Sequence, residues 1–248
     1  MNKRKLAVFV EGQTELIFVR EFLKQWYSYD ASKIGFNCYN LLANEFRDAE
    51  YKYGSEESEN YFMVVNVGND NSVLSKNLEN LNFIQNKGYQ LVIGLRDMYC
   101  SQYKKDVKGQ LISETVNQSF IQSVKDVLCN VPNGQYVDFH FAIMEIEAWF
   151  IAMHEYMLKL DEKLTPDFIK EHTGLDLDVD PETAIFHPAN ELAKIYSSVG
   201  KQYDKHQTDI SSIMSKLTPD DFLLLISSGK CPSFKRFAES LIGNSCNM

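Results

Sequence analysis

Two acidic residues stand directly after short apolar runs of the chain. Glu11 follows residues 6–10, and Asp97 follows the run 89–95 and Arg96. Such runs are too short for helices of their own and are typical of buried strands. In an open α/β sheet the carboxyl edge binds ligands, because the sheet fixes the side chains there. We therefore expect Glu11 and Asp97 to meet at this edge. The alternative is structural, with Glu11 a turn residue and Glu15 a favourable acid in the first turn of a helix.

A second acidic feature is the pair Glu145 and Glu147, which flanks Ile146 between two apolar runs. An unpaired carboxylate in apolar surroundings would be costly to desolvate, so each needs a partner. A metal ion or a lysine would serve. The alternative is that one glutamate caps a helix and the other faces water.

Three lysines, Lys104, Lys105 and Lys108, follow Asp97 in a segment predicted to be a loop. They could contact the phosphates of a nucleic acid beside the acids. They could equally form a solvated basic turn.

Strands and helices that alternate along the chain would position these residues. Strands are predicted at residues 6–10, 35–42, 61–67, 89–95 and 136–144, with helices at 15–27, 72–86 and 113–128 between them. Residues 44–60 are highly polar and read as an exposed excursion. This rhythm predicts an α/β fold with a mostly parallel sheet flanked by helices. The part after residue 147 shows helical patterns only, so we predict an α/β domain at 1–146 and a helical C-terminal part at 147–248 packed on it.

Composition narrows the possible classes of protein. The chain has 248 residues, 44% hydrophobic and 24% charged, and a formal net charge of -9. This charge argues against a protein that coats nucleic acid by overall electrostatics, although not against an enzyme that acts on it. No run approaches the roughly 18 apolar residues of a membrane helix, so we expect no membrane contact and a cytoplasmic location. Five scattered cysteines argue against a disulfide framework or zinc site. The chain also lacks a phosphate-binding GxxxxGK[ST] loop and a GxSxG nucleophile elbow.

Several motifs carry a resemblance to a known family. The segments that end in Glu11-Gly12 and in Asp97 look like the glutamate and aspartate motifs of the TOPRIM fold, which is shared by primases, topoisomerases and OLD nucleases. More specifically, the chain resembles a bacterial TOPRIM-like family of unknown function. Members of this family are often encoded beside an ATP-binding-cassette-type ATPase. The matching elements are VEGQTE, LRDMY, MEIEAWFIA, HPAN, YDK and CPSF.

The resemblance implies divalent metal ions, Mg²⁺ or Mn²⁺, held by acids that share one site. These ligands would be Glu11, Glu15, Asp97, Glu145 and Glu147. The catalytic residues would be Glu11, Asp97 and Lys205, with Glu11 either a ligand or a general acid/base. Lys205, which lies within the YDK element, could equally be a surface lysine in a polar loop. The usual second aspartate of the motif is replaced by Tyr99, so Glu145 or Glu147 would have to supply the missing ligand.

Carboxylates suit such chemistry, because Mg²⁺ and Mn²⁺ prefer oxygen ligands and keep positions for water and phosphate. We therefore expect a metal-dependent nuclease that cleaves DNA or RNA. The resemblance further implies an anti-phage defence role with an ATPase partner, in a homo-oligomer or hetero-complex. One alternative is a catalytically weak scaffold that binds nucleic acid or the ATPase, which Tyr99 favours. Another is a phosphohydrolase or nucleotidyl transferase that acts on small nucleotides.

Overall fold

The computed structural model describes residues 3–69, 72–107 and 109–243. It confirms the predicted fold class, an α/β fold with a six-stranded, mostly parallel sheet and a helical C-terminal region. The strands are β1 (Arg4–Val10), β2 (Ile34–Leu42), β3 (Glu45–Tyr53), β4 (Asn60–Asn66), β5 (Leu91–Asp97) and β6 (Val137–Ala142).

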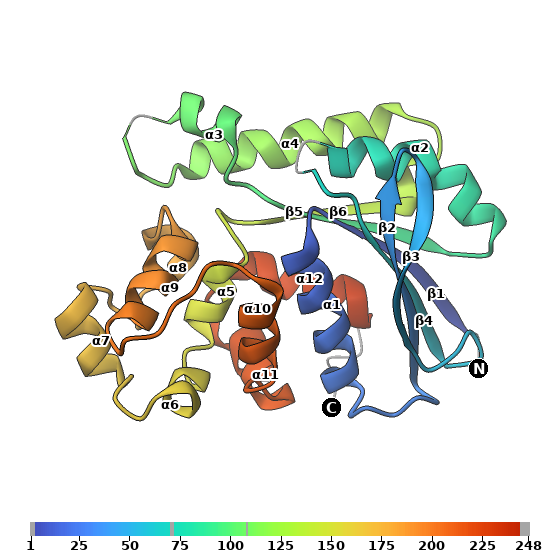
Figure 1. Cartoon of the computed structure of the whole chain (residues 1–248). Helices are drawn as coiled ribbons and strands as arrows, with labels where there is room; N and C mark the ends of the chain where they lie inside the picture. The colour runs from blue at the N-terminus through green and yellow to red at the C-terminus, as the bar shows by residue number, and fades with distance from the viewer. Residues whose placement is uncertain (1–2, 70–71, 108, 244–248) are drawn as a thin grey trace. The chain divides into compact units, whose positions relative to one another are not determined.

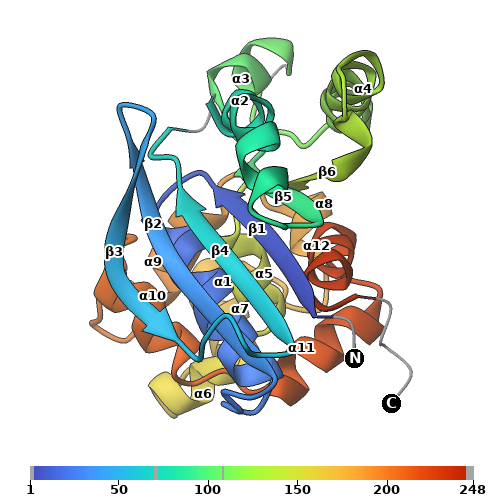
Figure 2. The same cartoon turned by 90° about the vertical axis from the view of Figure 1, so that its right-hand side faces the viewer.

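The sheet has the strand order β3-β2-β4-β1-β5-β6, and Figure 2 shows β3, β2, β4 and β1 side by side. Strand β1 pairs in parallel with β4 on one side and with β5 on the other. Val10 lies opposite Leu95, so β1 and β5 end at the same edge of the sheet, as predicted. Glu11 follows β1 at this edge, and Asp97 is the last residue of β5.

Strand β3 is a difference from the sequence-based expectation. Residues 44–60 read as an excursion, but β3 pairs antiparallel with β2 and forms one edge of the sheet. Its residues alternate between exposed and half-buried, as in a strand with one face on the protein and one in water. The many charged residues of this strand hid its alternation in the sequence.

By internal contacts the chain divides into two units. Unit 1 comprises Met1–Arg96, Ser119–Phe141 and Glu239–Met248, and unit 2 comprises Asp97–Gln118 and Ala142–Ala238. The predicted division after residue 146 is a different partition, and it stays a prediction.

In unit 1, two helices cover opposite faces of the sheet (Figure 1). They are α1 (Gln13–Trp26) and α2 (Val73–Asn86). Because side chains alternate along a strand, Ala7 and Phe9 face one side, where Leu81 and Ile84 of α2 join the same buried cluster. Val8 and Val64 are fully buried as well. Burial on both faces explains why the central strands read as continuous apolar runs.

Unit 2 is mainly helical. Its helices are α3 (Ser101–Asp106), α5 (Glu147–Ala152), α6 (Tyr156–Leu160), α7 (Pro166–Thr173), α8 (Pro181–Ala184), α9 (Pro188–Ser197), α10 (Gln207–Met214) and α11 (Pro219–Ser228). Two longer helices belong to both units, namely α4 (Glu114–Asn130) and α12 (Pro232–Ile242). Proline is the first residue of α7, α8, α9, α11 and α12. It is favourable there because the N–H that proline lacks would have no partner within the helix.

Helix α5 packs against α8 and α9. The core of unit 2 contains aromatic as well as aliphatic side chains, and the ring of Trp149 stacks on Phe237 at 5.8 Å between centroids. In the part of the chain that the structure describes, we find no helix long and apolar enough to cross a membrane.

Candidate metal centre

The segment after β5 is held against the segment that leads into α5. The amide N–H of Met98 donates to the carbonyl of Ala142 at 2.9 Å, and that of Tyr99 donates to Met144 at 2.8 Å. Asp97, which is buried, accepts a hydrogen bond from the amide of Ile146 at 3.1 Å. The carboxylate of Asp97 is therefore fixed beside the residue that separates the two glutamates.

Glu145 and Glu147 enter this site from the chain reversal that precedes α5. Met144 has a φ of 63°, a left-handed conformation that a bulky side chain rarely adopts and that surrounding contacts must maintain. Glu147 is fully buried at the first residue of α5. Glu145 is 9% exposed, and its Oε2 accepts a hydrogen bond from the amide of Ala189 in the first turn of α9 at 3.0 Å. The positive end of the α9 dipole thus favours the charge on Glu145.

Asp97, Glu145 and Glu147 form one acid cluster. Each offers a carboxylate oxygen, and these oxygens all lie within 4.8 Å of one another. Three carboxylates this close repel one another strongly, so a buried cluster of this kind needs cations. The structure thus brings together three of the five acids that the resemblance implied.

Lys205 supplies one cation to the acid cluster. Its ammonium lies 2.7 Å from Oε1 of Glu145 and 3.2 Å from Oε2 of Glu147. The phenol of Tyr203 donates a hydrogen bond to Oε1 of Glu147 at 2.7 Å. Of the two partners that the sequence left open for the glutamates, the lysine is therefore present. With all groups ionised, three carboxylates and one ammonium leave two negative charges.

The pKa values of these groups shift as the geometry requires. Burial alone would lower the pKa of Lys205, but the charges of Glu147, Asp97 and Glu145 raise it above its ordinary value. Burial raises the pKa of Glu147, and repulsion from Glu145 adds to this, against the opposing effects of Lys205 and Tyr203. Burial raises the pKa of Tyr203 as well, which keeps its proton available to Glu147.

Among the described residues, none forms a hydrogen bond with Oε2 of Glu147, which is buried and lies 3.2 Å from the Lys205 ammonium as an ion pair. Such an atom is an expected feature of a ligand whose partner is a metal ion. The donor set, carboxylate oxygens only, suits Mg²⁺ or Mn²⁺.

Glu11 and Glu15 belong to unit 1 and are not among the three residues of the acid cluster. Glu15 is buried near the start of α1, and its Oε2 accepts a hydrogen bond from the amide of Gly12 at 2.9 Å. It therefore lies in the first turn of α1, as the structural alternative held, and it also caps this helix, while its role as a metal ligand stays a prediction.

The basic segment after Asp97 differs from the predicted loop, because residues 101–106 form the short helix α3. Lys104 and Lys105 are exposed on it, and Lys108 lies outside the described residues. The Lys104 ammonium lies 4.8 Å from the ring centroid of Tyr99. Tyr99 in turn packs edge-to-face against His187 at 4.9 Å. An aromatic and cationic surface thus follows Asp97 where a second aspartate would stand in the usual motif.

Sequence reasoning did not assign a role to Tyr203 or to the amide of Ala189. Both lie in short elements that the resemblance had singled out, YDK and HPAN, and Lys205 lies in the first of these as well. The match of these elements to the family resemblance was the available signal. Their residue types do not show which carboxylate they contact.

Comparison with known proteins yields a family. No curated protein and no solved structure matches the chain. The model of a family described as a domain of unknown function matches residues 10–242. Since this match spans far more than half of the sequence, the chain belongs to the DUF4276 family.

Proposed function

We propose that this protein is a metal-dependent nuclease of the TOPRIM type that hydrolyses phosphodiester bonds of DNA or RNA. The observation that supports this most is the acid cluster, whose three carboxylate oxygens lie within 4.8 Å of one another around a single lysine. With all groups ionised, its surplus of two negative charges would match the charge of one divalent cation.

In this proposal Asp97, Glu145 and Glu147 hold Mg²⁺ or Mn²⁺. A bound divalent cation would supply an activated water and charge stabilisation for the leaving oxygen. Lys205, beside two of the carboxylates, offsets the negative charge of a phosphate. Tyr203 holds Glu147 in one orientation through its hydrogen bond, as groups behind metal ligands commonly do.

Other parts of the proposal depend on the sequence resemblance. These are the participation of Glu11 as ligand or general acid/base, the partnership with an ATP-binding-cassette-type ATPase, and a role in anti-phage defence. The exposed Lys104 and Lys105 would contact the phosphate backbone of the substrate.

A second candidate function is a catalytically inactive scaffold that binds nucleic acid or the ATPase. The observation that favours it is that Lys205 already forms ion pairs with Glu145 and Glu147. If these pairs are purely structural, the acid cluster needs no metal ion.

Titration calorimetry with Mn²⁺ distinguishes the two functions. We expect the wild-type protein to bind Mn²⁺ and Glu147→Gln to bind it at least tenfold more weakly. Glu171→Gln, which changes an exposed glutamate on α7, should bind as the wild type does. A parallel cleavage assay on plasmid DNA and transfer RNA should show activity that requires Mn²⁺ and is lost in Glu11→Ala. Absence of Mn²⁺ binding to the wild type would favour the scaffold.

A further inference from the structure

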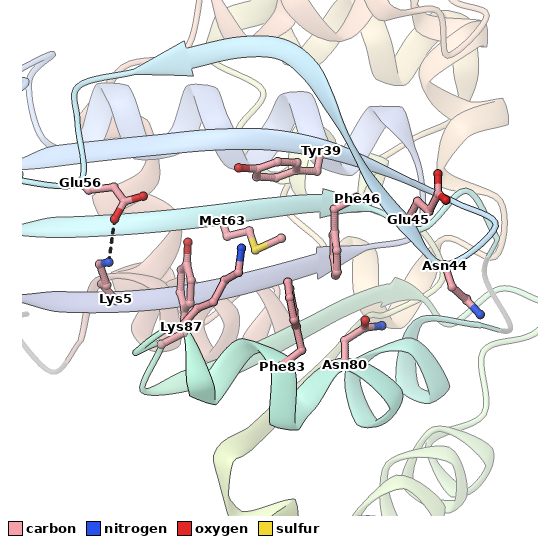
Figure 3. A pocket seen from close by; sticks show the side chains of 11 residues that line it. Lys5, Tyr39, Asn44, Glu45, Phe46, Glu56, Met63, Asn80, Phe83 and Lys87 are labelled. Carbon is pink, nitrogen blue, oxygen red and sulfur yellow. Dashed lines mark hydrogen bonds and ion pairs between the residues drawn. The ribbon is translucent and has the colours of Figure 1, made fainter.

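A cavity of about 690 Å³ lies within unit 1, between the sheet and helix α2 (Figure 3). The strands contribute Lys5, Tyr39 and Met63, and α2 contributes Asn80 and Phe83. Cavities of roughly 300–1,000 Å³ are typical of sites for small ligands. None of its lining residues belongs to the acid cluster, so its role is a separate question.

The walls of this cavity are rich in aromatic rings. Tyr39, Phe46, Phe83 and Tyr89 all line it. The rings of Phe46 and Phe83 stack at 5.5 Å with an angle of 10° between their planes, and Phe83 remains 42% exposed. Figure 3 shows these two rings reaching the cavity from β3 and from α2. Phe83 is exposed and the other three rings are half-buried, so the cavity offers aromatic surface on which a flat ring can pack.

Among the residues that the structure describes, the charges of the cavity lining leave one cation without a counterion. Lys5 pairs with Glu56 at 2.9 Å, and Glu45 pairs with Arg47 at 3.7 Å. Lys87 is the remaining charged residue of the lining. Over residues 3–69, 72–107 and 109–243 no carboxylate pairs with it, and its contact is with the ring of Phe83, 4.7 Å from the centroid. In Figure 3 its side chain extends from the end of α2 toward the sheet.

We propose that this cavity binds a small aromatic anion, such as a nucleoside monophosphate. The ring of the ligand packs on the aromatic wall, and its phosphate or carboxylate group pairs with Lys87. The ammonium provides the charge complementarity that an uncharged ring compound could not use. Neither contact involves the acid cluster, so the site does not depend on the proposed nuclease activity.

Met63 provides a reporter, because it lines the cavity and is only 5% exposed. The full-length protein with ¹³C-labelled methionine methyl groups would be titrated with AMP, UMP and indole-3-acetate, and with adenosine as the uncharged control. The Met63 resonance is assigned by its loss in Met63→Leu. We expect at least one of the three anions to shift this resonance in a saturable manner at millimolar or lower concentration. Adenosine should bind more weakly than AMP.

Two variants then test the proposed contacts. Lys87→Ala should weaken binding of the anion about tenfold or more and change adenosine binding less than twofold. Phe83→Ala should weaken both. Lys235→Ala, a change at an exposed lysine on α12, should change neither. The proposal is overturned if none of the three anions shifts the Met63 resonance, or if Lys87→Ala leaves the affinity for the anion unchanged.

Discussion

Two glutamates buried in unit 2, Glu147 and Glu182, have different kinds of partner. Glu147 is fully buried and lies in a cluster of three carboxylates beside one lysine. Glu182 is 4% exposed, and its partners are neutral donors. The indole N–H of Trp149 donates to its Oε1 at 3.0 Å, and the amide of Ser233 donates to its Oε2 at 3.2 Å. The hydroxyl of Ser233 donates to Oε1 as well.

The two glutamates differ in whether the protein itself supplies all of their partners. Both oxygens of Glu182 have hydrogen bonds, so its environment is complete within the protein. The cluster around Glu147 retains surplus negative charge and an oxygen without a hydrogen bond among the described residues. A buried acid whose partners are complete is explained by structure, whereas one whose environment calls for a further cation points to a ligand.

The largest effect that we expect is on the stability of variants at these two glutamates. Glu182→Ala should lower the free energy of unfolding by about 4 kcal/mol, because it removes the acceptor of the Ser233 amide and hydroxyl and creates a cavity. Glu147→Ala also leaves a cavity and removes the acceptor of the Tyr203 phenol, but it should cost less in metal-free protein because it relieves repulsion among carboxylates. Urea unfolding with EDTA present measures both. Equal losses for the two variants would contradict the distinction.

The next effect is a pH dependence of folding stability, which we attribute to Glu182. Burial raises its pKa to about 7, against the hydrogen bonds from Ser233 and Trp149, which lower it. The folded state therefore holds the proton more tightly than the unfolded state, whose glutamate pKa is about 4.3. This contribution to stability is complete below about pH 4.3 and is lost as the pH rises to about 7.

The loss should amount to about 4 kcal/mol, since the folded and unfolded pKa values differ by about 2.7 and each unit of pKa corresponds to about 1.4 kcal/mol. Glu182→Gln removes the titrating group and should flatten this part of the stability profile. Unfolding free energies of both proteins at several pH values between 4 and 8 provide the comparison. Parallel profiles would show that Glu182 does not titrate in this range.

A smaller effect is expected from Lys205→Ala, which leaves three carboxylates without their cation. Loss of one partner from a buried ion pair costs roughly 3–5 kcal/mol, but the Lys205 side chain is 36% exposed, so we expect about 2 kcal/mol. Addition of Mn²⁺ should recover part of this loss. Lys194→Ala, which removes an exposed pair of the same 2.7 Å length with Glu191, should cost less than about 0.5 kcal/mol with or without Mn²⁺. A Lys205 variant that Mn²⁺ does not stabilise would count against the metal centre.

The smallest expected effect on stability is that of Asp97→Asn. Asparagine keeps an oxygen that can accept the hydrogen bond from Ile146, and it removes one of three repelling charges. The free energy of unfolding should therefore change by less than about 1 kcal/mol, while Mn²⁺ affinity falls at least tenfold. Thermal unfolding with and without Mn²⁺ measures both quantities. A loss above about 2 kcal/mol without metal would instead assign Asp97 a structural role.

The sequence by itself determined the fold class and most of the elements. Apolar runs buried on both faces mark β1, β4 and β5, and threonine-proline pairs mark the starts of α7 and α11. These signals are local, because they depend on the period of side chains and on backbone preferences. The sequence could not reveal β3 or α3, since polar and charged residues in them masked the period.

Only the tertiary structure decided which polar groups share the acid cluster. Asp97, Glu145, Glu147 and Lys205 are up to about a hundred residues apart in sequence, and their meeting depends on how the chain reverses before α5 and where α9 begins. Glu15 is a different case, because its hydrogen bond from the amide of Gly12 is a local contact at the start of α1, and its role as a metal ligand stays a prediction. Charge and spacing show which residues are able to do chemistry, but packing decides which of them are close enough to do it together.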